Sequence, residues 1–267
     1  MKRLAVLLYG VVSYSVFFGT FLYLIGFVGN LFVPKSIDGN PAVPLPQAIL
    51  TNIGLVLLFG LQHSIMARQG FKRWWTKFVP KPIERSTFML FTCLALITLF
   101  VFWQPLGGVV WVIENGFAKG VLAASFALGW VVILVSTFLI NHFDLFGLRQ
   151  TWFYFRGQDY RNLPFKTPVL YRFVRHPLYF GFLLAFWSAP VMTVTHLLFS
   201  VSITAYILFA IRLEEKDLIS FYGEKYRAYR NIVPMIIPFF FKGTAKGPAY
   251  QTILKSTAQD EPNEAFL

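Results

Sequence analysis

LYFGFLLAFWSAPVMTVTHLLFSVSITAYILFAI, residues 178–211, is a run of 34 residues without a Lys, Arg, Asp or Glu. One helix of that length would measure about 50 Å, much more than the roughly 30 Å of a bilayer's hydrocarbon core. Pro190 follows Ser188 and Ala189 near the middle of the run, and proline interrupts helices. The run is therefore expected to form two shorter helices joined by a bend, a hairpin that returns to its starting side.

The composition of the chain is that of a membrane protein. Of its 267 residues, 56% are hydrophobic and 13% are charged, whereas soluble domains carry about 25% charged residues. Four other apolar stretches are long enough to cross a bilayer: 4–33, 47–66, 86–103 and 120–140. The sequence predicts an all-α polytopic membrane protein with four spans followed by the hairpin, five to six membrane helices in all.

The basic residues predict how these spans are oriented. The net charge is +12, and every Lys and Arg except Lys35 and Lys119 lies at the N-terminus, in 68–85, in 149–175 or after 211. The positive-inside rule places these four regions in the cytoplasm, which requires the hairpin to return. Because topology accounts for the positive charge, no nucleic-acid partner is expected.

Polar residues gather at both ends of the hairpin. They are Arg175, His176 and Pro177 before it, and Arg212, Glu214 and Glu215 after it. Taken alone, the first three fit an ordinary basic loop that leads into a helix with Pro at its first position. Two adjacent carboxylates at a cytoplasmic membrane edge do not serve that topology, so the six residues together indicate a site for a polar ligand.

The order of the motifs between residues 170 and 240 is specific. The motifs are Arg175-His176-Pro177-Leu178-Tyr179-Phe180-Gly181, Glu214-Glu215-x-x-Leu218, Phe221-Tyr222-Gly223-x-x-Tyr226-x-x-Tyr229, Val233-Pro234 and Ile237-Pro238. This combination resembles the C-terminal core of the isoprenylcysteine carboxyl methyltransferase-like membrane enzymes and of related phospholipid methyltransferases. The resemblance implies an S-adenosylmethionine site that contains Arg175, His176, Pro177, Tyr179, Gly181, Arg212, Glu214 and Glu215.

These residue types suit S-adenosylmethionine. Arg and His can bind its carboxylate, while Glu can bind its ammonium group or ribose. Tyr179 and the tyrosines at 222, 226 and 229 could flank the adenine or the sulfonium, or could be packing and interfacial residues. Gly181 would permit close approach of the backbone either to the cofactor or to another helix.

Two polar stretches in the first half of the chain narrow the resemblance. Residues 61–68 and 141–150 look like the bacterial branch that contains methanethiol S-methyltransferase and the denitrification-linked NnrU-type proteins. Membership would imply methyl transfer to methanethiol, with dimethyl sulfide as product, in a bacterial inner membrane. The alternatives are a prenylcysteine or phospholipid acceptor, and a non-enzymatic NnrU-type factor or transporter.

A small alkyl thiol is mostly protonated at neutral pH, so a base would assist its methylation. His63, His142 and Asp144 are the candidates, although a lone His at a helix end also has a structural reading. Asp144 could orient His142, or Arg149 could instead neutralise Asp144 or hold the cofactor carboxylate. The four His show no zinc-binding spacing, so no metal is expected.

The chain is expected to divide into three parts. Residues 1–141 form the N-terminal transmembrane helices, 142–241 form the methyltransferase core with the hairpin, and 242–267 form a polar tail. The expected partners are a small thiol and membrane lipid, and the sequence carries no signal for an oligomeric state.

Overall fold

Five helices in the computed structural model, which describes residues 1–238, are long and apolar enough to cross a membrane. They are α1 (Lys2–Gly29), α2 (Leu45–Ala67), α4 (Lys81–Phe102), α5 (Gly116–Ile140) and α9 (Val194–Tyr222). Each predicted span lies within a few residues of one of these helices, so the all-α, multi-pass membrane architecture is confirmed. The tail expected over 242–267 lies outside the described residues.

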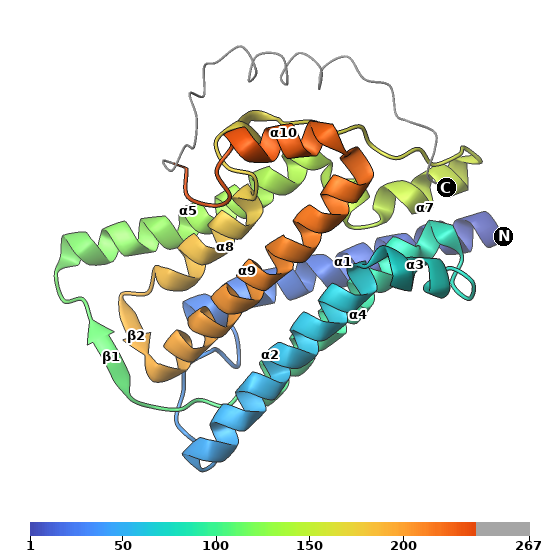
Figure 1. The fold of residues 1–267 in the computed structure, drawn as a ribbon. Coiled ribbons are helices and arrows are strands. Elements are labelled where there is room, and N and C mark those ends of the chain that lie inside the picture. The colour runs from blue at the N-terminus through green and yellow to red at the C-terminus, as the bar shows by residue number, and fades with distance from the viewer. Residues whose placement is uncertain (239–267) are drawn as a thin grey trace.

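Shorter elements connect the long helices (Figure 1). The helical ones are α3 (Gln69–Trp75), α6 (His142–Leu145), α7 (Leu148–Arg156), the 3-10 turn Val169–Arg172, α8 (Pro177–Trp187) and α10 (Glu224–Ile232). Two strands, β1 (Val109–Val112) and β2 (Val191–Thr193), pair antiparallel with an irregularity next to Val109.

The apolar run at 178–211 forms the predicted hairpin. Its first arm, α8, has 11 residues and is about 16 Å long. Its second arm is α9, and the indole of Trp187 donates to Thr204 Oγ1 at 3.0 Å across the two arms. The bend between them is not a simple turn, because it contains β2, which pairs with β1. A strand of three residues is too short for hydropathy to reveal.

The basic loops within residues 1–238 lie at one end of the bundle. There Arg68 after α2 pairs with Asp217 of α9 at 2.9 Å, and Arg85 of α4 donates to the Leu145 carbonyl at 2.8 Å. The loops after α1 and α4 lie at the other end, where the Trp103 indole donates to the Ile37 carbonyl at 3.2 Å and Thr193 donates to Asp38. The hairpin therefore starts and finishes at the basic end.

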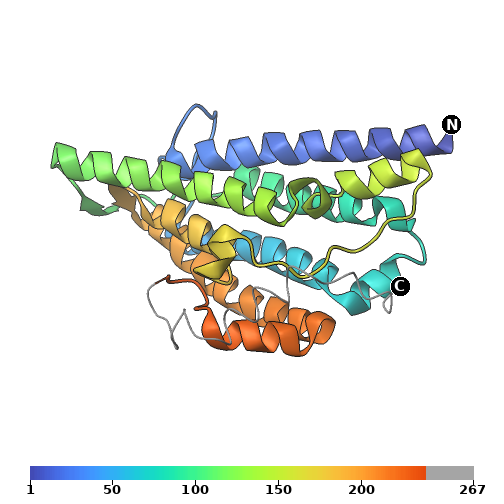
Figure 2. The same cartoon turned by 90° about the horizontal axis from the view of Figure 1, so that it is seen from above.

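Two glycines allow α5 and α8 to pack closely. A Cβ atom on Gly181 would lie 2.7 Å from the Gly129 carbonyl oxygen, and a Cβ on Gly129 would lie 2.7 Å from the Gly181 carbonyl oxygen. Seen from above, α1 runs along one edge of the bundle, and α9 with α10 runs along the opposite edge (Figure 2). The hairpin is thus held by α5 on one side, while its second arm borders α2.

Candidate active site

The Arg175-His176 segment is held in place by its backbone. The amide of Arg175 donates to the Pro234 carbonyl at 2.9 Å, and the amide of His176 donates to the Met235 carbonyl at 3.1 Å. The guanidinium of Arg175 also donates to the carbonyls of Arg230 and Val233, at 2.7 and 2.6 Å. The segment that precedes α8 is therefore fastened to the chain that follows α10.

Glu215 lies at the centre of the polar cluster. Its Oε1 accepts from Arg175 Nε at 2.7 Å and lies 3.2 Å from His176 Nε2, while Arg230 Nη1 lies 3.8 Å from its Oε2. The side chain is only 11% exposed. The sequence predicts that Arg175, His176 and the glutamate pair converge, and the structure brings them together.

Glu214 has different surroundings from its neighbour. Its Oε2 accepts from the Tyr179 hydroxyl at 2.9 Å and lies 3.8 Å from His176 Nδ1. The side chain is 42% exposed, and it has no Lys or Arg partner among residues 1–238. The two adjacent glutamates therefore differ in burial and in charge compensation.

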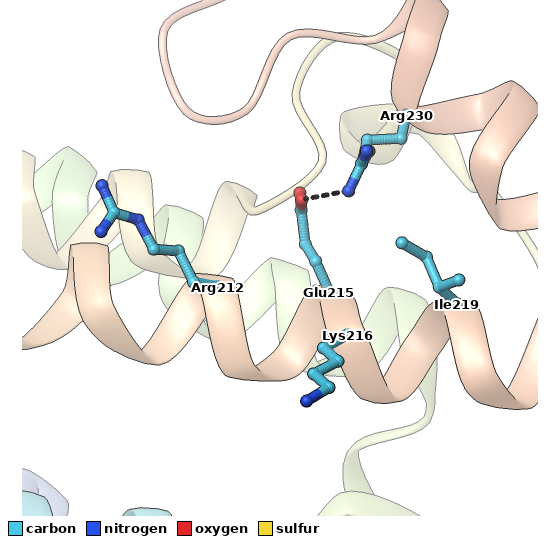
Figure 3. A pocket seen from close by; sticks show the side chains of 5 residues that line it. All are labelled: Arg212, Glu215, Lys216, Ile219 and Arg230. Carbon is cyan, nitrogen blue, oxygen red and sulfur yellow. Dashed lines mark ion pairs between the residues drawn. The ribbon is translucent and has the colours of Figure 1, made fainter.

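A pocket of about 300 Å³ opens beside this cluster, between α9 and α10. It is lined by Arg212, Glu215, Lys216, Ile219 and Arg230. Figure 3 shows Arg230 reaching from α10 toward Glu215, with Arg212 one helical turn away along α9. Within the described chain, Arg212 and Lys216 form no ion pair. The pocket thus combines one compensated carboxylate with two uncompensated cations.

Tyr226 on α10 has a buried hydroxyl that lacks a hydrogen-bond partner in the described residues. Burial and the nearby carboxylates of Glu215 and Glu214 raise the pKa of Tyr226, so this hydroxyl stays protonated. Its ring packs with those of Phe165 and Tyr229. These contacts support the alternative in which Tyr226 and Tyr229 are packing residues. The Tyr226 hydroxyl is in addition a hydrogen-bond donor close to the polar cluster.

A strap of residues 157–168 joins α7 to the same cluster. At its start, the Arg149 guanidinium lies over the Phe153 ring at 4.9 Å and over the Tyr160 ring at 5.3 Å. Burial and the Asp144 carboxylate raise the pKa of Tyr160 to about 12. At its other end, Phe165 packs against α10. The strap therefore links the stretch at 141–150 to the aromatic wall of the site.

His142 and Asp144 do not form a pair. His142 lies between Tyr14 and Thr137, with its Nε2 2.7 Å from the Tyr14 hydroxyl and its Nδ1 2.8 Å from Thr137 Oγ1. Asp144 instead accepts from Arg149 at 2.8 Å. Of the alternatives left open by the sequence, the one in which Arg149 neutralises Asp144 is therefore observed.

His63 lies on the other side of an apolar cluster from His142. That cluster consists of Met66, Phe88, Met89 and Phe146. Phe88 packs against His63 and Phe146 packs against His142, with centroid distances of 5.0 and 4.8 Å. His63 Nδ1 lies 3.2 Å from Thr92 Oγ1, whose own hydrogen goes to the Phe88 carbonyl. Nδ1 of His63 is then the protonated nitrogen, and Nε2 carries the lone pair.

Two other candidates, Pro177 and Gly181, have structural roles in α8. Pro177 is the first residue of α8, and Gly181 contacts α5, which is the helix-packing alternative for that glycine. Arg230, Lys216 and Ile219 line the pocket but are absent from the motif-based prediction. Helical periodicity could have indicated Arg230, because it lies four residues after Tyr226 on α10 and so shares a face with it.

The chain matches one described family and is similar to several named relatives. A family described as a protein of unknown function (DUF1295) matches residues 64–233, which contain the whole polar cluster. A methanethiol S-methyltransferase of Crocosphaera subtropica is 54% identical over 91% of this chain and 95% of its own length. Those of Bradyrhizobium diazoefficiens (number 2) and Mycobacterium tuberculosis are 52% and 48% identical, each over 90% of this chain, and over 92% and 98% of their own lengths.

The chain belongs to the methanethiol S-methyltransferase family. The alignment with these family members extends over both halves of the chain, so it includes the N-terminal helices as well as the hairpin. No solved structure matches the chain.

Proposed function

We propose that this protein transfers a methyl group from S-adenosylmethionine to methanethiol and releases dimethyl sulfide. The assignment of the acceptor rests on relatives named methanethiol S-methyltransferase. They are about 50% identical to this chain, and the alignments cover nearly their full length. The structural observation that carries the proposal is the pocket, whose lining includes the buried carboxylate of Glu215 and two cations, Arg212 and Lys216, that form no ion pair within residues 1–238.

The residues around this pocket fit S-adenosylmethionine. Arg212 and Lys216 have no partner in the described chain, so they are available to a carboxylate. The buried hydroxyl of Tyr226 lacks an acceptor, which a ribose or carboxylate oxygen can supply. Arg175 and His176 hold the carboxylate of Glu215 in position at the pocket. A cationic ligand in the pocket would then lie close to this carboxylate.

When bound, S-adenosylmethionine supplies a methyl group on a positively charged sulfur. The chain must then hold the thiol on the side of that methyl group opposite to the leaving sulfur, and it must keep water away. A small acceptor needs little room beside the cofactor pocket. The apolar helices around α8 and α9 provide a low-dielectric wall, in which fixed charges act strongly.

We also propose how the protein is oriented in the membrane and which part of the chain contains the cofactor site. The basic end, with the N-terminus and the pocket, faces the cytoplasm of a bacterium across the inner membrane, because the basic loops lie there. S-adenosylmethionine then reaches the pocket directly. Residues 1–141 form the N-terminal transmembrane helices, and residues 142–241 carry the cofactor site.

The test is headspace gas chromatography with protein purified in detergent, S-adenosylmethionine and methanethiol. Dimethyl sulfide is expected from the wild type, and the double variant Arg212→Ala/Lys216→Ala is expected to bind S-adenosylmethionine at least tenfold more weakly by calorimetry. Glu224→Gln, an exposed glutamate paired with Arg227, serves as the matched control. If the wild type binds S-adenosylmethionine but makes no dimethyl sulfide, the cofactor assignment stands and the acceptor is a prenylcysteine or a lipid. If it neither binds nor reacts, the non-enzymatic alternative is favoured.

A further inference from the structure

We infer that the carboxylate of Glu214 receives the proton of the acceptor thiol, so that the two adjacent glutamates serve different substrates. This inference rests on the proposed function and deepens it, because it assigns the base for the thiol. It departs from the expectation that both glutamates bind the cofactor.

The first support is the contrast in charge compensation. Glu215 is engaged through both oxygens by Arg175, His176 and Arg230, and it is almost buried. Oε2 of Glu214 accepts from the uncharged Tyr179 hydroxyl and lies 3.8 Å from His176 Nδ1, while Oε1 has no partner in the described residues. A carboxylate oxygen that no cation neutralises remains able to take a proton.

The second support is direction around α9. Successive residues of a helix are about 100° apart, so Leu213 and Asp217 share a face with Tyr206, while Glu215 points about 180° away from it. That face contacts α2, since the Tyr206 hydroxyl lies 3.2 Å from Ser64 Oγ and Asp217 pairs with Arg68. Glu214 lies about 80° from Tyr206. It therefore lies between the direction of Glu215 and the seam between α2 and α9, and about 160° from the pocket residues Arg212 and Lys216.

The third support is the chemistry of that seam. A Cβ atom on Gly60 of α2 would lie 3.0 Å from the Tyr206 ring, so the glycine lets the ring approach α2 closely. Phe59 packs edge-on against the same ring at 5.7 Å. Apart from the ion pair between Arg68 and Asp217, the seam thus presents aromatic and small apolar groups with two hydroxyls, Ser64 and Tyr206. These surroundings suit a small thiol better than a charged ligand.

The step balances without a further reactant. The S–H proton of the thiol passes to Glu214, and the thiol sulfur forms a bond to the methyl carbon. The bond between that carbon and the sulfonium sulfur breaks, and its electron pair leaves on the donor as a neutral thioether. Glu214 then releases its proton to water through its exposed side, which regenerates the carboxylate.

His63 is the rival base, because its Nε2 carries a lone pair and it precedes Ser64. Its observed contacts are with Phe59, Phe88 and Thr92, and none of these residues belongs to the cofactor cluster. Glu214, in contrast, touches Tyr179 and lies next to Glu215. The geometry therefore favours the carboxylate.

The experiment compares Glu214→Gln, His63→Ala and Glu224→Gln in detergent. Calorimetry measures the affinity for S-adenosylmethionine, and headspace chromatography measures turnover with methanethiol and with a more acidic fluorinated thiol. Glu214→Gln is expected to bind the cofactor within about threefold of wild type and to lose at least 100-fold in turnover of methanethiol, a typical effect of losing a general base. The loss should be less than about tenfold with the acidic thiol, which ionises without help.

Three outcomes would overturn the inference: lost cofactor affinity in Glu214→Gln, unchanged turnover in Glu214→Gln with a large loss in His63→Ala, or equal losses with both thiols. Glu214→Asp keeps the charge and provides a second variant if Glu214→Gln does not fold. It should retain cofactor affinity and lose more turnover with methanethiol than with the acidic thiol; equal losses would again overturn the inference. An inactive wild type would instead count against the proposed function itself.

Discussion

Arg175 and Glu215 form a 2.7 Å ion pair that joins the start of α8 to the C-terminal part of α9. Both side chains are 11% exposed. The same guanidinium also holds two carbonyls near the end of α10. One arginine therefore fixes three segments around the candidate cofactor pocket.

Replacing Arg175 should damage both stability and cofactor binding. Arg175→Ala leaves a nearly buried carboxylate without its closest cation, and breaking a buried pair in this way typically costs about 3 kcal/mol or more. We expect a lower thermal midpoint in detergent and weaker calorimetric binding of S-adenosylmethionine. Arg227→Ala removes an exposed arginine that is also paired with glutamate, and should change neither quantity. Similar effects in the two variants would contradict this role for Arg175.

A methyl group added at Gly181 should disturb the hairpin. Gly181→Ala places Cβ 2.7 Å from the Gly129 carbonyl oxygen and 2.8 Å from Ile133 Cγ1, so α5 and α8 must separate. Overpacking of this kind typically costs about 1–3 kcal/mol. The matched control is Gly54→Ala on α2, where the added Cβ meets nothing within 4 Å. Thermal unfolding of the two variants should differ, and equal midpoints would show that the contact is not tight.

His142 should make stability depend on pH. Burial lowers its pKa below the ordinary value, so the folded state binds this proton less readily than the unfolded state. A depressed pKa gives stability that is present above the unfolded pKa, near 6.5, and is lost as pH falls toward the folded value. The thermal midpoint of the wild type should therefore fall more steeply than that of His142→Gln as the pH decreases below about 6.5. Parallel curves would remove His142 as the cause.

The strap at 157–168 should open when its anchor is removed. Arg149→Ala deletes the cation between Phe153 and Tyr160 and the partner of Asp144. Because such contacts are worth about 1–2 kcal/mol, trypsin should cleave after Arg161 or Lys166 roughly tenfold faster. Arg227→Ala is again the control. Unchanged cleavage would mean that Phe165 alone secures the strap.

Hydropathy and charge placement were sufficient for the membrane architecture. A 34-residue apolar run with Pro190 near its middle favours a hairpin, which brings the adjacent glutamates at 214 and 215 back to the basic residues that precede the run. These predictions depend on chain length and charge, which are local properties of the sequence.

The pairing of the candidate site residues could not be predicted, because most of it depends on contacts between distant segments. His142 and Asp144 are two residues apart on a helical turn, so they point in nearly opposite directions and cannot pair. The Gly147 turn, with φ of 88°, instead brings Arg149 back onto Asp144. Similarly, the residues that face Gly181 and Phe165 lie 52 and 61 positions away, at Gly129 and Tyr226. No spacing rule within one element reaches that far.

The return of the hairpin has a consequence for how ligands arrive. With 29 residues, α9 is about 43 Å long, so it extends beyond the roughly 30 Å hydrocarbon layer and carries its charged residues with it. A charged ligand can then approach at the water boundary and leave by the same route without entering the bilayer. A small apolar ligand has a second route, since it can dissolve in the lipid and diffuse in from the side. The membrane itself would then act as the reservoir for one substrate and the outlet for one product.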